Sequence, residues 1–293
     1  MLGMRIVITL VSKGRLGNLL FTLAFAHSLR VSGVSEKIPI KIEYDAKAFR
    51  SDSDSIKFLN KYARVCNHVR LVKSNESIKV FRHKVFGLKS KVSTLDFLSN
   101  PHRFINPNEF HLSDVILKGY FQNYESIALG LPIVSKEVVN LIRELEIVVS
   151  KNFSKEPYSL VHVRRTDYLS EENRELGILS KEYYAESLRI FGKDSQVIVT
   201  TDELNLQSDF LPCHHRVFSS LNLSTIEALS MFLSANRVFM ANSSFSWWGS
   251  MLNLYSNSYS TPLLVAPFPW FKNVDASRAI FHPAFKLSKA IHS

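Results

Sequence analysis

The segment RVFMANSSFSWWGSMLNLY, residues 237–255, joins an apolar run to a hydroxyl-rich turn and then to a second apolar stretch. Residues 237–241 have the composition of a short buried strand. Residues 246–255 carry apolar side chains at helical spacing. The sequence therefore predicts an α/β connection, in which a strand ends and a helix begins at the serines.

The turn itself contains Ser243, Ser244 and Ser246. The first amide N–H groups of a helix have no partner within the helix and, together with the helix dipole, they favour an anion. Serine hydroxyls can add further donors, so this turn is a candidate phosphate site. The alternative is that Asn242 or Ser243 is only an N-cap. We expect the two tryptophans that follow to be packing residues beneath the turn rather than sugar platforms.

A second apolar run, residues 158–163, is followed directly by Arg164 and Arg165. Open α/β sheets bind their ligands at the carboxyl ends of such strands. A guanidinium can fork onto phosphate oxygens, and each charge-assisted bond contributes about 1.5–3 kcal/mol. Two adjacent arginines therefore suit a diphosphate, although adjacent arginines on a surface are usually only solvated charge.

The second half of the chain alternates strand-like and helical stretches. The strand-like runs are residues 158–163, 196–200, 215–218, 237–241 and 262–266, and the helical stretches are residues 181–191, 224–234 and 246–255. This alternation predicts a parallel sheet with right-handed crossovers, as in nucleotide-binding proteins. Asp202 follows one of these strands, where a carboxylate can meet a ribose or base; a plain helix cap is the alternative.

The N-terminal part has a similar opening. Residues 5–11 are strand-like, and residues 19–31 are predicted to form an amphipathic helix. Between them, Gly14, Gly17 and Asn18 form a glycine-containing turn that allows the backbone to approach a ligand closely. The spacing lacks the Walker and dinucleotide fingerprints, so an ordinary tight turn is the alternative.

The region between the glycine turn and the arginine pair gives weaker signals. It contains predicted strands at residues 38–44 and 115–120 and predicted helices at residues 55–62, 90–98 and 135–150. Residues 152–157 are polar and end in a proline, which is typical of a linker. We therefore predict two domains, residues 1–154 and 155–293.

Composition and charge exclude some classes of protein. The 293 residues are 46% hydrophobic and 21% charged, which is typical of a globular protein with a substantial core. The net charge of +10 is spread along the chain rather than concentrated in one arm. The scattered charge and the absence of a stacking motif argue against a nucleic-acid binder. The charge suits a nucleotide-sugar site together with peripheral attraction to an anionic inner membrane.

Cysteine usage and the N-terminus bear on the compartment. Cys66 and Cys213 are too few and too far apart in sequence to indicate a disulfide framework or a zinc site, and no Cys/His cluster has metal-ligand spacing. Lys13, Arg15 and Asn18 interrupt the N-terminal apolar segment, so we expect neither a signal peptide nor a spanning helix. A cytoplasmic protein is the simplest interpretation.

Four stretches of the sequence resemble one family. Residues 162–168, HVRRTDY, resemble the His-x-Arg-Arg-x-Asp-Tyr signature of the α-1,2-fucosyltransferases, glycosyltransferase family 11. Residues 242–249, NSSFSWWG, resemble the second hallmark of that family, and residues 14–18 and 119–122 resemble two further motifs in the same order. The sequence departs from the family pattern at Leu19 and at residues 200–203.

The resemblance implies a GT-B-like fold, with two Rossmann-type domains and the donor site in the cleft between them. It implies an inverting, metal-independent transfer of L-fucose from GDP-L-fucose to the 2-hydroxyl of a terminal β-galactoside on an oligosaccharide or lipid-linked glycan. The N-terminal domain would be on the acceptor side and the C-terminal domain would bind GDP-fucose. No cofactor or divalent metal is expected.

The family motifs also imply roles for particular residues. Arg164 and Arg165 would stabilise charge on the departing GDP, and Asp167 and His162 are the candidate bases for the acceptor hydroxyl. The alternative role of Asp167 is only to orient the arginines. The donor-binding set would be Gly14, Arg15, Gly17, Asn18, Asp202, Asn242, Ser243, Ser244, Phe245 and Ser246.

Two other functions fit the same residues. The enzyme could use another GDP-deoxyhexose or form another linkage, because the acceptor half gives the weakest signals. The chain could also be a nucleotide-sugar binding protein without turnover, which would bind the donor but form no product.

Overall fold

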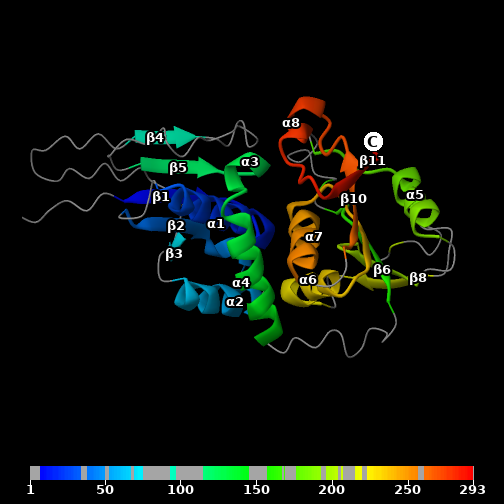
Figure 1. The fold of residues 1–293 in the computed structure, drawn as a ribbon, viewed down its shortest axis with the longest axis horizontal. Coiled ribbons are helices and arrows are strands. Elements are labelled where there is room, and N and C mark those ends of the chain that lie inside the picture. The colour runs from blue at the N-terminus through cyan, green and yellow to red at the C-terminus, as the bar shows by residue number, and fades with distance from the viewer. Residues whose placement is uncertain are drawn as a thin grey trace, which may run out of the picture. The chain divides into compact units, whose positions relative to one another are not determined.

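The computed structural model describes residues 7–33, 38–49, 53–66, 69–74, 93–96, 115–144, 157–166, 168, 176–192, 196–203, 206, 215–219, 223–256 and 261–292 (Figure 1). The chain divides into two compact units, Met1–Val134 and Ser135–Ser293. Each unit contains one β-sheet in which all the assigned pairings are parallel. The predicted α/β class, with two Rossmann-type units as in GT-B proteins, is confirmed.

The division between the units differs from the predicted domain boundary. The boundary after residue 154 lies outside the described residues, whereas the compact units divide after Val134. That position is inside helix α4, Leu131–Glu144, which runs from one unit into the other. The strands of the first sheet all precede α4 and those of the second sheet all follow it. Each unit therefore contains one whole sheet, and helix α4 connects the two units.

The sheet of the first unit has the order β3-β2-β1-β5-β4 (Figure 1). Its strands are β1 Ile8–Ser12, β2 Ile40–Asp45, β3 Val69–Ser74, β4 Ser93–Asp96 and β5 Val115–Gly119. The helices are α1 Leu16–Val31, α2 Ser53–Val65, α3 Tyr124–Ile127 and the 3₁₀ turn η1 Ala46–Phe49. The predicted helix at residues 90–98 is wrong, because part of it is strand β4, paired with β5.

The order of the first sheet explains how the glycine turn is placed. Strand β1 lies between β2 and β5, and helix α1 begins at Leu16, earlier than the predicted start at residue 19. Gly17 and Asn18 are therefore in the first helical turn rather than in the loop. Because parallel strands end at the same edge of a sheet, the turn after β1 lies beside the segment after β5.

The sheet of the second unit has the order β11-β10-β9-β6-β7-β8. Its strands are β6 Ser159–Val163, β7 Val197–Thr201, β8 His215–Ser219, β9 Arg237–Phe239, β10 Leu263–Phe268 and β11 Phe285–Lys289. Its helices are α5 Lys181–Phe191, α6 Thr225–Leu233, α7 Ser244–Ser256 and α8 Val274–Arg278. The predicted strands and helices of this half are confirmed, while β11 and α8 were not predicted.

The second sheet brings three segments together at one edge. Strand β6 lies between β9 and β7, in the registers Ser159↔Arg237 and Ser159↔Val197. The arginine pair follows β6, Asp202 follows β7, and the serine turn follows β9. These segments are distant in sequence, but strand pairing makes them neighbours.

Helix α7 is held by its apolar side chains. Trp247 and Trp248 are completely buried, and the indole N–H of Trp247 donates to the carbonyl of Ile280 at 2.8 Å. Gly249 faces helix α6, where an added Cβ would lie 2.4 Å from the ring of Phe232. The expectation that both tryptophans are packing residues is confirmed, and Gly249 permits the close approach of the two helices.

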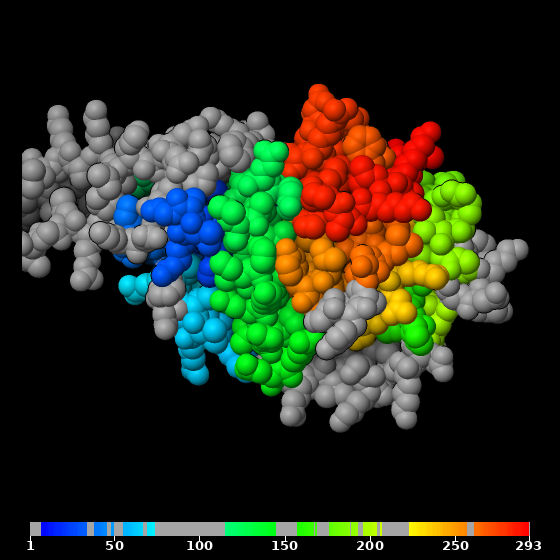
Figure 2. All heavy atoms as spheres, in the orientation of Figure 1, coloured from blue at the N-terminus to red at the C-terminus, as the bar shows by residue number. Residues whose placement is uncertain are grey.

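The C-terminal segments lie at the surface of the second unit. Helix α8 and strand β11, orange-red and red in Figure 2, carry the exposed side chains of Val274 and Leu287. Strand β11 is an edge strand, and only Phe285 and Ser288 of its five residues are buried. Among the described helices, none combines the length and the apolar character needed to cross a bilayer.

Candidate functional site

The arginine pair at the end of β6 is organised by Asp202. Oδ1 of Asp202 accepts the backbone N–H of Arg165 at 3.0 Å, and Oδ2 accepts the hydroxyl of Thr166. Nε of Arg164 lies 3.2 Å from the same Oδ2. Both carboxylate oxygens are therefore engaged by the segment that follows β6, and Asp202 fixes the orientation of the Arg164 guanidinium.

The charge on Asp202 is stabilised by these contacts. Burial alone raises the pKa of the Asp202 carboxyl, but the Arg164 charge and the hydrogen bonds from Thr166 and the Arg165 N–H lower it, so the net pKa is below its ordinary value. Asp202 is consequently an anion at neutral pH. Asp202 is a predicted donor-binding residue, and its contacts in the structure are with Arg164, Arg165 and Thr166.

The two arginines have different surroundings. The side chain of Arg164 is only 16% exposed, and that of Arg165 is 33% exposed, with its Nη1 3.5 Å from Oε2 of Glu203. Arg164 is thus held tightly against a buried carboxylate, whereas Arg165 sits in a more open ion pair. The carboxylates of Asp202 and Glu203 each hold one of the two guanidinium groups at the carboxyl end of the sheet. Anionic ligands bind at this end in α/β folds.

His162 is inside the sheet and does not reach the surface. Its side chain is buried, and its ring centroid lies 5.4 Å from that of Phe245 and 5.9 Å from that of Phe232. Burial, reinforced by the Arg164 charge and opposed by Asp202, lowers the pKa of His162 to about 3. Nδ1 has no hydrogen-bond partner among the described residues. This enclosed, neutral ring does not suit a base that must meet an acceptor hydroxyl.

The other candidate base, Asp167, lies outside the described residues, so its role stays a prediction. The residue after it, Tyr168, is described. Its backbone N–H donates to the carbonyl of Arg165 at 3.1 Å, and its hydroxyl donates to the backbone carbonyl of Asn242 at 2.8 Å. Tyr168 is the last residue of the 162–168 motif, and the motif alone predicted no role for it.

The serine turn is built largely by its own side chains. The hydroxyl of Ser246 accepts the N–H of Ala241 at 3.1 Å, and the hydroxyl of Ser243 accepts the N–H of Phe245 at 3.3 Å. The side-chain amide of Asn242 donates to the carbonyls of Leu176 and Gly177. These residues therefore shape the turn, whatever else they bind.

Ser244 occupies a different position from the other serines. It is the first residue of α7 and is partly exposed, while Ser243 and Ser246 are buried. The first helical bond of α7 runs from the N–H of Trp247 to the carbonyl of Ser243. The ring of Phe245 packs on His162, which holds this first turn against the end of β6. The N-terminus of α7 thus lies next to residues 164–168, the arginine segment, and both features favour an anion.

In the first unit, the glycine turn is locked by Asn18. Gly14 has a φ of +84°, and an added Cβ would lie 2.4 Å from the amide nitrogen of Asn18. Oδ1 of Asn18 accepts the side-chain N–H of Gln122 at 2.9 Å. Arg15 is exposed and occupies the N-cap of α1 without a side-chain capping bond. The first turn of α1 has no acidic residue.

Gln122 was not among the predicted site residues, although its stretch was matched to a family motif. It follows Phe121, which has a φ of +52°. Non-glycine residues seldom adopt this conformation, so the surroundings must hold it. The ring of Phe121 stacks on Phe25 with a centroid distance of 4.8 Å and an interplanar angle of 9°. This stack fixes the turn after β5 and presents Gln122 to Asn18.

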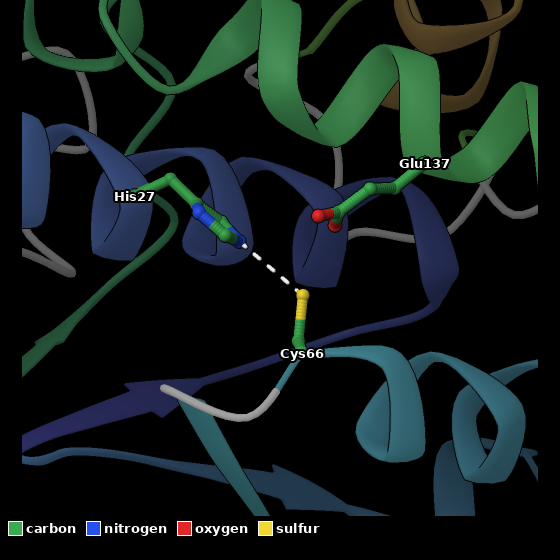
Figure 3. Close-up of side chains that lie close together, drawn as sticks. All are labelled: His27, Cys66 and Glu137. Atoms are coloured by element: carbon green, nitrogen blue, oxygen red, sulfur yellow. Dashed lines mark hydrogen bonds between the residues drawn. The ribbon is translucent and has the colours of Figure 1, made fainter.

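One group of ligand-type side chains lies apart from these motifs (Figure 3). Nε2 of His27, on α1, is 3.6 Å from Sγ of Cys66 and 3.2 Å from the hydroxyl of Tyr62. Figure 3 also draws Glu137, which comes from α4. His27 and Cys66 have side chains of the types that bind metal ions. Their wide sequence spacing gave no signal.

The second unit is thus a parallel-sheet α/β unit that gathers two arginines and a helix N-terminus at the carboxyl edge of its sheet, which is the type of site that binds phosphate-bearing substrates. The chain belongs to glycosyltransferase family 11, because the sequence model of "Glycosyl transferase family 11" matches residues 116–271. The match contains Gln122, the arginine pair, Asp202 and the serine turn; the glycine turn lies outside it.

Two curated relatives come from Escherichia coli. The O-antigen biosynthesis glycosyltransferase WbnK is 22% identical, and the similarity covers 90% of this chain and 95% of the relative. An α-1,2-colitosyltransferase is 32% identical over 124 residues, which is 38% of this chain and 40% of the relative.

Solved structures show weaker likenesses. The E. coli ADP-heptose lipopolysaccharide heptosyltransferase II has a TM-score of 0.48 at 10% identity, covering 97% of this chain and 90% of that protein. The NodZ α-1,6-fucosyltransferase co-crystallised with GDP has a TM-score of 0.43 at 15% identity, covering 85% and 92%. The family assignment rests on the sequence match and not on these scores.

Proposed function

We propose that this glycosyltransferase moves L-fucose from GDP-L-fucose to the 2-hydroxyl of a terminal β-galactoside, with inversion and without a divalent metal. The observation that carries the proposal is the placement of Arg164 and Arg165 beside the N-terminus of α7, on neighbouring parallel strands. The arginines are held by carboxylates of the same unit, and the helix start is held against β6 by the Phe245–His162 contact. This arrangement suits a diphosphate leaving group.

The chemistry needs charge stabilisation more than covalent catalysis. When the bond between fucose C1 and the GDP oxygen breaks, negative charge develops on the diphosphate and the sugar becomes oxocarbenium-like. The two guanidinium groups and the amides of the α7 N-terminus would stabilise the departing GDP. The acceptor oxygen forms the new bond to C1 and gives its proton to a base. With His162 enclosed, Asp167 is our candidate for that base.

A second candidate donor carries colitose instead of fucose. It is favoured by the segment that is 32% identical to the α-1,2-colitosyltransferase. The two sugars would use the same diphosphate contacts, so the arginines and the serine turn do not distinguish them. The discriminating contacts would lie around the sugar ring.

The experiment that tests the function is GDP release from GDP-L-fucose and from GDP-colitose, with and without a panel of galactose-terminated oligosaccharides and in excess chelator. We expect acceptor-dependent release and a product of the mass and α-1,2 linkage of a fucosylated galactoside. Acceptor-dependent GDP release from GDP-colitose but not from GDP-L-fucose would show that colitose is the transferred sugar. Tight donor binding without any product would favour a binding protein, and no binding of either donor would overturn the proposal.

We further propose that the protein works in the cytoplasm, peripherally at an anionic membrane surface that carries a lipid-linked acceptor. The support is the net charge of +10, since each basic residue near such a surface contributes about 1 kcal/mol at low salt. Co-sedimentation with phosphatidylglycerol vesicles, but not with phosphatidylcholine vesicles, is expected at low salt. Equal binding to both would contradict an electrostatic attachment.

A further inference from the structure

Asn242 connects the serine turn to the chain that follows the arginine pair. Its backbone carbonyl accepts the hydroxyl of Tyr168 at 2.8 Å. Its side-chain amide donates to the carbonyl of Leu176 at 2.8 Å and to that of Gly177 at 3.0 Å. Tyr168 and Leu176 stand on either side of residues 169–175, which lie outside the described residues. One buried asparagine therefore holds the chain at two points.

The contact between Asn242 and Tyr168 also affects the arginine segment. The backbone N–H of Tyr168 donates to the carbonyl of Arg165 at 3.1 Å, so the turn from Arg165 to Tyr168 is closed. Asn242 anchors the tyrosine end of this turn, and Asp202 anchors its start through the N–H of Arg165. The position of the Arg165 backbone is thus set from two neighbouring strands.

The second point is a rigid one. Gly177 has a φ of +71°, and an added Cβ would lie 2.5 Å from Nδ1 of His292. His292 contacts the carbonyl of Pro269 through Nε2 at 2.9 Å and pairs with Leu179 in an antiparallel bridge. The segment that Asn242 grips is therefore fixed from its other side by the C-terminal residues.

The chemistry of the contact requires an amide. The NH₂ group of asparagine supplies two donors, and here both go to carbonyl oxygens. Aspartate has nearly the same shape but would place a carboxylate oxygen against those two carbonyls. The substitution Asn242→Asp therefore removes the donors without changing the volume of the side chain.

We propose that Asn242 is a positioning residue of the transferase, which holds the arginine segment in register with the N-terminus of α7, rather than a ligand of the donor. This inference rests on the proposed use of that edge for a diphosphate. It assigns to Asn242 and Tyr168 a role that neither motif revealed, because the bonds link residues from two separate stretches of sequence.

The chain supplies a matched control near the C-terminal end of α7. The side chain of Asn253 is also buried, and its amide also donates to two carbonyls, those of Phe232 and Ala235. Asn253→Asp breaks the same kind of contact far along α7 from the arginine segment. A role that is only structural predicts the same outcome for both asparagines.

The experiment compares Asn242→Asp, Asn253→Asp and Tyr168→Phe with the wild type by thermal unfolding, GDP affinity and the separate kcat and KM for the donor. We expect both aspartate variants to lose thermal stability, but only Asn242→Asp to weaken GDP binding, by tenfold or more. Tyr168→Phe should keep its melting temperature and weaken GDP binding about threefold, with the change in KM larger than that in kcat.

Equal GDP affinity in Asn242→Asp and Asn253→Asp would overturn the positioning role. If the aspartate variants do not fold, Tyr168→Phe decides, and unchanged GDP affinity in that variant would overturn the role. Absence of GDP and donor binding in the wild type would instead refute the proposed function. Amide hydrogen exchange would then still test the contact. In Tyr168→Phe, exchange should be faster than in the wild type in the peptides of residues 164–168 and 176–180. Exchange in peptides from β10 should be the same in both proteins. Unchanged exchange in the first two peptides would sink the proposal.

Discussion

Nε of Arg164 lies 3.2 Å from Oδ2 of Asp202, across the ends of two neighbouring parallel strands. The pair is mostly buried, and the same carboxylate accepts the backbone N–H of Arg165. A carboxylate that is occupied in this way has a structural task within the site. It sets the direction of the guanidinium before any ligand arrives.

Asp202→Asn should therefore weaken GDP binding by about tenfold, because the guanidinium loses the charge that orients it. The pKa of Asp202 is lowered in the folded protein from 3.8. Its charge therefore stabilises the fold above pH 3.8, and this contribution is lost as the pH falls through the folded pKa. Calorimetric GDP titration and unfolding at pH 7 and pH 3 measure both effects.

The matched control is Glu186→Gln. Glu186 forms an ion pair with Arg189 on the surface of α5. Surface pairs contribute little, so we expect neither GDP affinity nor stability to change appreciably. Equal affinity of Asp202→Asn and wild type would show that Asp202 does not organise the arginine.

Arg164→Lys should reduce kcat/KM for the donor by at least tenfold. Lysine keeps the charge but cannot make the forked contact that a guanidinium makes with an oxyanion. Arg189→Lys, at a position with a side-chain exposure of 78%, serves as the control and should have wild-type kinetics. Full activity in Arg164→Lys would remove Arg164 from its assigned role.

His162→Gln should make the protein less sensitive to acid. The pKa of His162 is lowered from 6.5 to about 3 in the folded protein. Below pH 6.5 the imidazole is therefore protonated in the unfolded chain but stays neutral in the folded chain. The stability contributed by the neutral ring is complete above pH 6.5 and is lost as the pH falls towards 3. Between pH 6.5 and pH 5 this amounts to about 2 kcal/mol.

Denaturant unfolding at pH 7 and pH 5 measures the difference, and the wild type should lose more stability than the variant. The activity of His162→Gln should follow the same pH profile as that of the wild type from pH 6 to pH 8. If turnover instead disappears while GDP still binds, His162 is a catalytic base after all.

Gly249→Ala should destabilise the second unit by about 1–3 kcal/mol through overpacking, because the new Cβ would lie 2.4 Å from the Phe232 ring. The neighbouring Ser250→Ala is the control. The Ser250 hydroxyl is buried and has no hydrogen-bond partner among the described residues, so its removal should be neutral or slightly stabilising. Equal thermal stability of the two variants would contradict close packing of α7 on α6.

The sequence predicted the second sheet well, because each of its central strands is a short apolar run between helical stretches. It predicted the edges poorly. The burial of strand β11 does not alternate from residue to residue, and α8 is a short helix, so neither element has a strong hydrophobic period. Residues 93–96 were placed in a helix, yet they pair with β5. Pairing with a distant strand overrides local preference there.

The candidate site was predicted as a set of residues but not as a set of roles. Residue types indicated an anion site at the arginines and at the serine turn. Local patterns could not show that Asp202 contacts Arg164. They also could not show that the side-chain amide of Asn242 donates to two backbone carbonyls. These contacts join segments that are far apart in sequence. The enclosure of His162 between Phe232 and Phe245 is likewise a product of tertiary packing.

The pairing of β6 with β9 joins residues that are far apart in the chain, in the register Ser159↔Arg237. Contacts of high sequence separation form slowly, because the intervening chain must be ordered before the pairing can stabilise it. The arginines and the serine turn therefore become neighbours only when β6 and β9 have paired. The anion site should therefore form late in folding, together with the long-range pairing of these two strands.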